Sequence, residues 1–298
     1  MPLIPLRPLL ETVDKYHFAQ GAFNVNAVAQ AKAAIEVHEM FRSAAILQGA
    51  DLANGFMGGR TDFQNATLED KKVGAKNIAD AVKKYAENSP IPVVLHLDHG
   101  KNFVSCKAAI EGGYTSVMID GSKLDYESNI EVSKKVADVA ASMGIPCEAE
   151  LGKVGGKEDD LVAVADTNTD PQEAREFVER TGVTSLAVAI GTAHGFYVGT
   201  PVLDKERLSE IREVVDIPLV LHGASGLSDE DVMDCVKRGI CKVNFATELR
   251  AAYSKAVRET LEDEKVFDPK AYGKAGIAAV KELVMARMKV CGCDGKAE

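Results

Sequence analysis

The chain has 298 residues, of which 46% are hydrophobic and 27% charged, and its formal net charge is −10. These values are ordinary for a soluble globular protein, and the negative charge disfavours nucleic acid or an anionic membrane as a partner. No apolar run approaches the roughly 20 residues of a membrane-spanning helix. The amino-terminal stretch lacks the charged-then-apolar layout of a signal peptide. The six scattered cysteines show neither zinc-ribbon nor disulfide spacing, which favours a cytoplasmic location.

Strand-like and helix-like stretches alternate along the chain. An amphipathic helix is expected within the first 18 residues, and eight apolar, β-rich runs are each expected to form a strand. The predicted strands cover residues 21–26, 44–49, 93–98, 115–120, 146–152, 185–191, 218–222 and 240–245. The predicted helices cover residues 27–41, 70–87, 103–111, 126–143, a segment that begins near Pro171, 204–215, 228–237, 248–263 and 270–289. Residues 50–69 and 152–170 are polar or glycine-rich and are predicted as loops, the second of them mobile.

This alternation predicts an α/β fold: a closed (β/α)₈ TIM barrel with extra terminal helices, forming a single domain over residues 1–298. A doubly wound parallel sheet would show the same alternation. Eight strands without a linker between them favour the closed barrel. In such a barrel the active site lies at the carboxyl ends of the strands, so polar residues that follow the predicted strands are the candidates for chemistry.

Polar side chains do gather at these strand ends. The run VVLHLDHGK (93–101) ends in Asp98 and His99, and strand alternation places His96 and Asp98 on one face and His99 on the other. Other predicted strands end in Asp120, Glu148, Glu150, His194, His222 and Asn244. Three neutral imidazoles, those of His99, His194 and His222, meeting at one mouth predict a divalent metal site with Zn²⁺ as the first choice. Three protein ligands leave a coordination position open for substrate.

Two turns rich in small residues predict an anion site. Residues 222–226 (HGASG) and 243–248 (VNFATE) each join a predicted strand to a predicted helix. Such turns expose backbone N–H groups and direct a helix amino terminus at an anion. The loops after the seventh and eighth strands are the usual phosphate cradle of a barrel. Lys153, Arg250 and Arg287 are candidates for holding a second phosphate.

Several motifs occur in order from Gly21 to the end of the chain: GAFNVN, HLDHG, MIDGS, EAELGKVGG, GTAHGFY, LHGASG and KVNFATELR. Together they resemble the class II, zinc-dependent fructose-bisphosphate aldolases and tagatose-bisphosphate aldolases. The resemblance implies that His99, His194 and His222 bind the catalytic zinc. It also implies that Asp120 and Glu150 hold a second or alternate divalent metal.

The same resemblance implies which groups move protons and hold the substrate. It makes Asp98 the proton donor and Glu158 the carboxylate that moves the carbon-bound proton. The implied dihydroxyacetone-phosphate pocket comprises Gly195, Gly223, Ala224, Ser225, Asn244, Phe245, Ala246 and Thr247. Asn24 falls where the family places an amide that faces the substrate. A monovalent cation, Na⁺ or K⁺, is implied beside the phosphate. The implied assembly is a homodimer or homotetramer, with Arg287 as a candidate to reach the neighbouring subunit.

The expected reaction is the reversible cleavage of a ketose 1,6-bisphosphate, foremost fructose 1,6-bisphosphate, to dihydroxyacetone phosphate and glyceraldehyde 3-phosphate, as in glycolysis. Ala50 stands where many family members have a phosphate-binding serine, and Ala246 replaces an aspartate of one branch. The ATEL wording is more similar to the tagatose branch, so tagatose bisphosphate or another ketose phosphate stays an alternative. Two further alternatives are a Schiff-base aldolase that uses Lys242 and a non-catalytic phosphosugar-binding protein.

Overall fold

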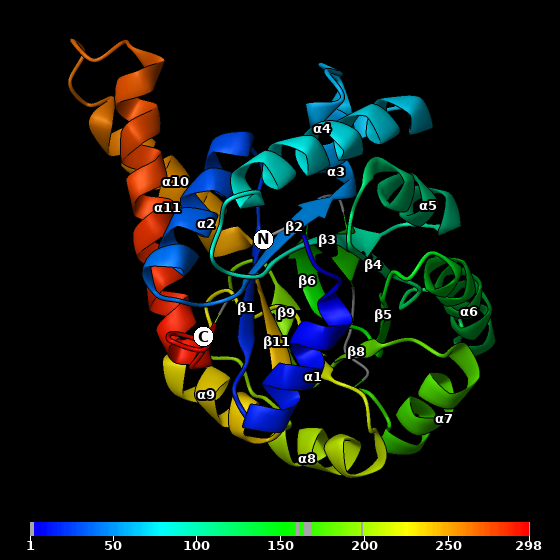
Figure 1. The fold of residues 1–298 in the computed structure, drawn as a ribbon. Coiled ribbons are helices and arrows are strands. Elements are labelled where there is room, and N and C mark those ends of the chain that lie inside the picture. The colour runs from blue at the N-terminus through cyan, green and yellow to red at the C-terminus, as the bar shows by residue number, and fades with distance from the viewer. Residues whose placement is uncertain (1–2, 159–160, 164–167, 198, 298) are drawn as a thin grey trace.

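The computed structural model describes residues 3–158, 161–163, 168–197 and 199–297. Within these residues, eight parallel strands close into a barrel in the order β1-β11-β10-β8-β5-β4-β3-β2 (Figure 1). The barrel strands are β1 (Gln20–Asn24), β2 (Ala45–Ala50), β3 (Val93–Gly100), β4 (Ser116–Ile119), β5 (Cys147–Leu151), β8 (Ser185–Val188), β10 (Leu219–Leu221) and β11 (Ile240–Phe245). The predicted TIM barrel is therefore confirmed.

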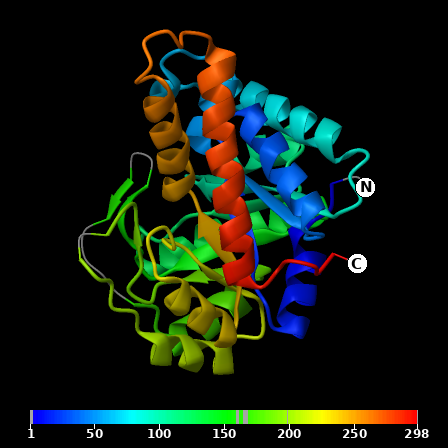
Figure 2. The ribbon, with the colours of Figure 1, turned by 90° about the vertical axis from the view of Figure 1, so that its left-hand side faces the viewer.

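Helices surround the barrel, except that the first helix, which precedes all the strands, lies across its amino end (Figure 1). They are α1 (Leu6–Tyr16), α2 (Val28–Met40), α3 (Asp51–Met57), α4 (Leu68–Ala86), α5 (Phe103–Gly112), α6 (Tyr126–Ser142), α7 (Pro171–Thr181), α8 (Lys205–Val214), α9 (Asp229–Lys237), α10 (Thr247–Thr260) and α11 (Pro269–Cys291). The terminal helices α10 and α11 pack side by side, and their joined ends project beyond the barrel (Figure 2). None of the helices in the described part combines the length and apolar character of a membrane span.

Local sequence determines several of the helix starts. Asp170 precedes α7, and its Oδ1 accepts hydrogen bonds from the backbone N–H groups of Gln172 and Glu173 at 2.8 and 3.1 Å. Pro171 fits the first helical position because that residue needs no hydrogen-bond donor. Ser228 caps α9 in the same way, through the N–H of Asp231 at 3.1 Å. The predicted starts of both helices are confirmed within a residue.

The two predicted loops contain regular structure, so those predictions were wrong. Residues 50–69 include α3 and a short 3₁₀ helix, Phe63–Asn65. Helix α3 packs closely against α4, because a Cβ on Gly74 would lie only 1.7 Å from the backbone oxygen of Asn54. Residues 152–170 include a hairpin of two antiparallel strands, β6 (Gly155–Glu158) and β7 (Leu161–Ala163). Strand β6 also pairs in parallel with the short strand β9 (Ala193–His194), and this small sheet lies at the end of the barrel opposite α1 (Figure 2).

Candidate active site

Three histidines converge at the carboxyl end of the barrel. His99 lies near the end of β3, His194 ends β9, and His222 follows β10. The ring of His99 lies 4.9 Å from that of His194 and 4.8 Å from that of His222, between centroids, and the other two rings are 6.0 Å apart. One nitrogen from each ring lies within 4.8 Å of the other two. The structure thus brings together the three side chains that the sequence identified.

His99 reaches this cluster through an irregularity in β3. The pairing of β3 with β4 shifts register between Leu97 and Gly100, and His99 has a φ of 46°. A left-handed backbone is uncommon for a residue other than glycine, and it breaks the regular alternation of side chains. The prediction that His99 faces away from Asp98 was therefore wrong. The bulge turns the imidazole into the barrel mouth, where it meets His194 and His222.

Carboxylates orient two of the three rings. Asp120 Oδ2 accepts a hydrogen bond from His99 Nδ1 at 2.9 Å, which leaves Nε2 as the ligand atom of that ring. Glu148 Oε1 accepts from His222 Nε2 at 3.1 Å, which leaves Nδ1 as the ligand atom there. A hydrogen bond from a carboxylate to the second ring nitrogen is the usual support of a metal-binding histidine, because it fixes the tautomer and the ring orientation.

The surroundings of His222 fit a bound cation. Its Nδ1 lies 3.0 Å from Glu150 Oε2, and both atoms are buried. Among the described residues, neither atom has a hydrogen-bond partner in good geometry. A positive ion near both atoms would satisfy the lone pair of the nitrogen and the charge of the oxygen. These residues therefore fit a divalent metal with nitrogen and oxygen ligands.

Electrostatic interactions shift the pKa values of His222 and Asp120. Burial disfavours a charged His222, but the adjacent Glu148 and Glu150 carboxylates outweigh it and raise the pKa of His222 to about 9. Burial likewise opposes ionisation of Asp120, yet hydrogen bonds from His99 and Ser122 lower the pKa of this carboxyl. The carboxylates thus favour positive charge at the position of His222, either as a proton on the ring or as a cation bound in its place.

A buried ion network lies beneath the histidines, inside the barrel. The Nζ of Lys242 lies 3.1 Å from each carboxylate oxygen of Glu148, and both side chains are fully buried. His96 Nε2 lies 3.8 Å from Glu148 Oε2, and its Nδ1 is 2.8 Å from Ser116 Oγ. Burial, helped by the charge of Lys242, lowers the pKa of His96 to about 3, so this ring is neutral. Sequence reasoning did not predict this network.

Asp98 sits among amide side chains at the same mouth. Its Oδ2 accepts a hydrogen bond from Asn24 Nδ2 at 2.8 Å, and its Oδ1 accepts one from Asn244 Nδ2 at 3.0 Å. Gln48 in turn donates to Asn24 Oδ1 at 2.7 Å. The carboxylate is therefore fixed between β1 and β11, beside the histidine that follows it. The backbone of Glu158 ends β6, whereas its side chain lies outside the described part of the structure.

The two predicted phosphate turns lie side by side. Ser225 Oγ accepts a hydrogen bond from the backbone N–H of Glu248 at 3.5 Å, which connects the turn after β10 to the first turn of α10. Ala246 precedes α10 and has no side-chain oxygen that could cap the helix. Helix α10 thus begins with amide groups available to an external anion. Ala224, Asn244 and Phe245 are buried in the same region, Thr247 begins α10, and Gly195 follows His194.

Arg287 supports this region from within its own chain. Its Nε and Nη2 donate to the two carboxylate oxygens of Glu248 at 2.9 and 2.7 Å, and its Nη1 donates to Asp229 Oδ1 at 2.8 Å. The guanidinium also lies over the ring of Phe245, 5.5 Å from its centroid. The suggestion that Arg287 reaches a neighbouring subunit is therefore not needed to explain its position. It ties the start of α10 to α11.

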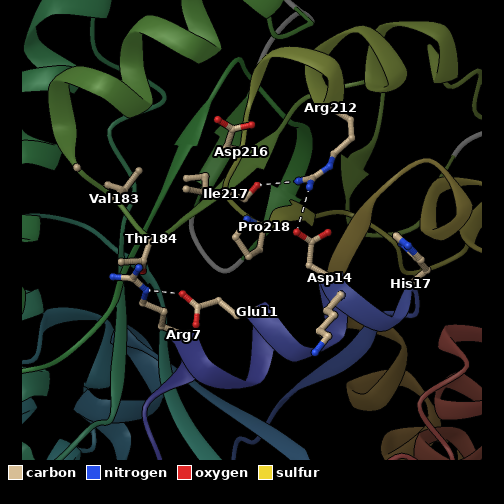
Figure 3. A pocket seen from close by; sticks show the side chains of 12 residues that line it. Arg7, Glu11, Asp14, His17, Val183, Thr184, Arg212, Asp216, Ile217 and Pro218 are labelled. Carbon is tan, nitrogen blue, oxygen red and sulfur yellow. Dashed lines mark hydrogen bonds and ion pairs between the residues drawn. The ribbon is translucent and has the colours of Figure 1, made fainter.

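A separate cavity of about 500 Å³ lies at the opposite end of the barrel, next to α1 (Figure 3). Charged side chains line it, and four of them form two ion pairs. Arg7 Nε contacts Glu11 Oε1 at 2.7 Å, and Arg212 Nη2 contacts Asp14 Oδ2 at 3.0 Å. None of the predicted site residues lines this cavity. The predicted site residues therefore lie away from this cavity.

Comparison with known proteins agrees with this architecture: a TIM barrel with a candidate metal centre at its carboxyl end. The family described as "Fructose-bisphosphate aldolase class-II" matches residues 4–296. A fructose-bisphosphate aldolase from Geobacillus stearothermophilus is 38% identical over 300 residues, covering 100% of this chain and 99% of that protein. The chain therefore belongs to the class-II fructose-bisphosphate aldolase family and is an aldolase, a carbon–carbon lyase.

Solved structures support the same assignment. The YdjI aldolase from Escherichia coli K12 is 34% identical and superposes with a TM-score of 0.83, covering 99% of this chain and 100% of that chain. A fructose-bisphosphate aldolase (Fba) from Campylobacter jejuni has a TM-score of 0.82 at 22% identity, covering 99% and 97% of the two chains. At that identity the likeness concerns the fold alone. The family is generally metal-dependent and acts on phosphosugars.

Proposed function

We propose that this aldolase reversibly cleaves fructose 1,6-bisphosphate to dihydroxyacetone phosphate and glyceraldehyde 3-phosphate, with Zn²⁺ held by His99, His194 and His222. The observation that carries the proposal is the convergence of these three rings beside the Glu150 carboxylate. When bound, the ion supplies Lewis-acid chemistry that stabilises negative charge developing on the substrate. Asp120 orients His99, and together with Glu150 it is the proposed site of a second or alternate divalent ion.

Asp98 is the proposed acid–base residue for the carbon–carbon bond. In cleavage it takes the proton from the hydroxyl on the carbon that becomes the aldehyde, and in condensation it returns this proton. The amides of Asn24 and Asn244 hold its two oxygens, which keeps the carboxylate in one orientation. As the bond breaks, its electron pair stays with the three-carbon fragment. Glu158 then delivers a proton to the carbon of that fragment.

The turn after β10 and the start of α10 are the proposed phosphate site. Gly223, Ala224 and Ser225 offer backbone N–H groups, and Ala246, which precedes α10, has no side chain that could cap the helix. Gly195, Phe245, Ala246 and Thr247 complete the proposed pocket, with Na⁺ or K⁺ beside the phosphate. A homodimer or homotetramer acting in cytoplasmic glycolysis belongs to the same proposal.

The direct test is cleavage of fructose 1,6-bisphosphate before and after removal of divalent metal. We expect activity to disappear with a chelator and to return with Zn²⁺. Borohydride added with substrate should trap no covalent adduct, because Lys242 is buried and ion-paired with Glu148. Chelator-resistant activity together with borohydride trapping would contradict the proposal. Tight binding of the sugar without turnover would instead support a non-catalytic phosphosugar-binding protein.

Tagatose 1,6-bisphosphate is the second candidate substrate, since Ala246 provides neither a carboxylate nor a hydroxyl at the start of α10. Ala50, at the end of β2, likewise offers no side-chain donor to a phosphate. The relative from Geobacillus stearothermophilus is named a fructose-bisphosphate aldolase, which favours fructose. Comparing kcat/KM over a panel of ketose mono- and bisphosphates decides between them.

A further inference from the structure

A row of hydrogen bonds runs from the β6 hairpin to the proposed phosphate turn. The N–H of Gly155 donates to the carbonyl oxygen of Thr192 at 3.2 Å. The N–H of Ala193 donates to the hydroxyl of Tyr197 at 2.9 Å. The same hydroxyl donates to the carbonyl oxygen of Gly223 at 2.7 Å. One side chain therefore connects two backbone segments that are far apart in the sequence.

Two rigid peptide groups make this row continuous. Thr192 and Ala193 share one peptide group, and Gly223 and Ala224 share another; both are trans. A trans peptide places its C=O and N–H on opposite edges of one plane. The row therefore passes through Thr192–Ala193, crosses the Tyr197 hydroxyl and passes through Gly223–Ala224. Every donor faces the same way, and the row ends at the N–H of Ala224 in the proposed phosphate turn.

The segments that the row joins are in close contact. Gly223 has a φ of +66°, and a Cβ at this position would lie 2.7 Å from the carbonyl oxygen of Ala193. A Cβ on Gly226 would lie 3.4 Å from the ring of Tyr197. The turn after β10 thus curves around Tyr197 and rests against β9. Because little space separates the turn after β10 from β9, a displacement of one segment must displace the other.

We propose that Tyr197 is a positioning residue that couples phosphate binding at residues 223–226 to the placement of His194 and of β6. This inference rests on the proposed function of the phosphate turn and of His194, and it extends that function. An anion that accepts a hydrogen bond from the Ala224 N–H polarises the Gly223–Ala224 peptide group. This polarisation strengthens each hydrogen bond of the row back to Gly155. Ala193 directly precedes His194, and β6 pairs with β9 and ends at Glu158. Phosphate binding would thereby order the metal ligand and the hairpin together.

Cobalt binding tests this coupling, with Co²⁺ measured by competition with a chelator in the presence and absence of inorganic phosphate. In the wild-type enzyme we expect phosphate to tighten Co²⁺ binding at least ~5-fold, the lower end of typical coupling between sites. In Tyr197→Phe the increase in Co²⁺ affinity caused by phosphate should fall below ~2-fold, because the row of hydrogen bonds loses the hydroxyl that joins its two halves. Tyr126→Phe is the matched control, since that hydroxyl also donates to a backbone carbonyl, Glu173 O at 2.9 Å, away from the site. It should retain the wild-type coupling.

Amide hydrogen exchange gives a second measurement that needs no variant. Phosphate should slow exchange at Gly155 and Ala193 in the wild-type enzyme by at least ~5-fold, in line with the same coupling. Unchanged exchange at both amides, or full coupling in Tyr197→Phe, would overturn the role of Tyr197. The proposed metal site has its own test. If His222→Ala binds Co²⁺ as tightly as the wild type does, the metal site itself is refuted, whatever Tyr197→Phe shows.

Discussion

Replacing Lys242 by Met should strongly destabilise the metal-free enzyme. The ammonium contacts both oxygens of Glu148 at 3.1 Å, and neither side chain is exposed to solvent. Without the ammonium, the buried Glu148 carboxylate keeps only its weaker contacts such as those with His222 and His96. Removing one member of a buried ion pair typically costs about 3–5 kcal/mol. The cost should exceed that of Lys281→Met by at least ~2 kcal/mol, because the Lys281–Glu36 pair is partly exposed and such pairs contribute little.

A double variant separates the charge effect from the loss of packing. Glu148→Gln combined with Lys242→Met removes both charges, so we expect it to regain at least half of the ~3–5 kcal/mol lost by Lys242→Met alone. The measurement is the free energy of unfolding of the metal-free proteins in urea. If the double variant is as unstable as Lys242→Met, or if Lys242→Met lies within ~1 kcal/mol of the wild type, the electrostatic reasoning is refuted.

The pH dependence of the stability of Lys242→Met tests the direction of the electrostatic effect. Burial alone would raise the pKa of Glu148, but Lys242, His96 and His222 outweigh it and lower that pKa. Loss of the ammonium should raise the folded-state pKa of Glu148 from this lowered value. A carboxyl with a lowered pKa contributes stability above its unfolded-state pKa and loses it as pH falls through the folded-state pKa, and the variant lacks part of this contribution. The penalty of Lys242→Met should therefore be larger at pH 7 than at pH 3.

Three further predictions concern the mouth of the barrel and its outer core. Asp98→Asn should lower kcat by at least ~10²-fold with unchanged zinc content, measured by turnover and metal analysis; near-normal turnover would remove Asp98 from the mechanism. Asp120→Asn should weaken metal binding about 10–100-fold in chelator competition, because His99 loses its charged partner; unaltered affinity would contradict that support. Burial lowers the pKa of His38 to about 4, so stability present above pH 6.5 is lost as pH falls toward 4. Metal-free wild type should thus lose about 2 kcal/mol more than His38→Gln between pH 7 and pH 4.5 in urea unfolding; equal losses would argue against a neutral His38.

Hydrophobic patterning predicts most of the barrel because each strand carries its own signal. The last predicted strand, 240–245, has the bounds observed for β11. Helix α3 was missed because its stability depends on close contact with Gly74 of α4, which lies well outside the local sequence. The β6 hairpin was missed for a similar reason. Its first strand pairs with β9, a partner of only two residues that follows much later in the chain.

The chemistry of the site could be predicted from residue types at strand ends, but its geometry could not. Alternation placed His99 on the wrong face, because the bulge arises from the pairing of β3 with β4. The Glu148–Lys242 pair and the Tyr197 connection join segments whose separation in space no local pattern reveals. One signal was present for Glu148, since it lies two residues before Glu150 and so shares its face of β5. The prediction that the strand-end histidines lie together succeeded because all barrel strands end at the same mouth.

The ion network beneath the histidines has a consequence for how this enzyme can diversify. Glu148, Lys242 and His96 lie on strands deep inside the barrel, whereas Ala50 and Ala246 sit at its edge with side chains that form no polar bonds. Under the proposed function, mutations at those edge positions are expected to alter which sugar is accepted, while the buried ion network stays intact. Selection can therefore explore new substrates at little risk to folding.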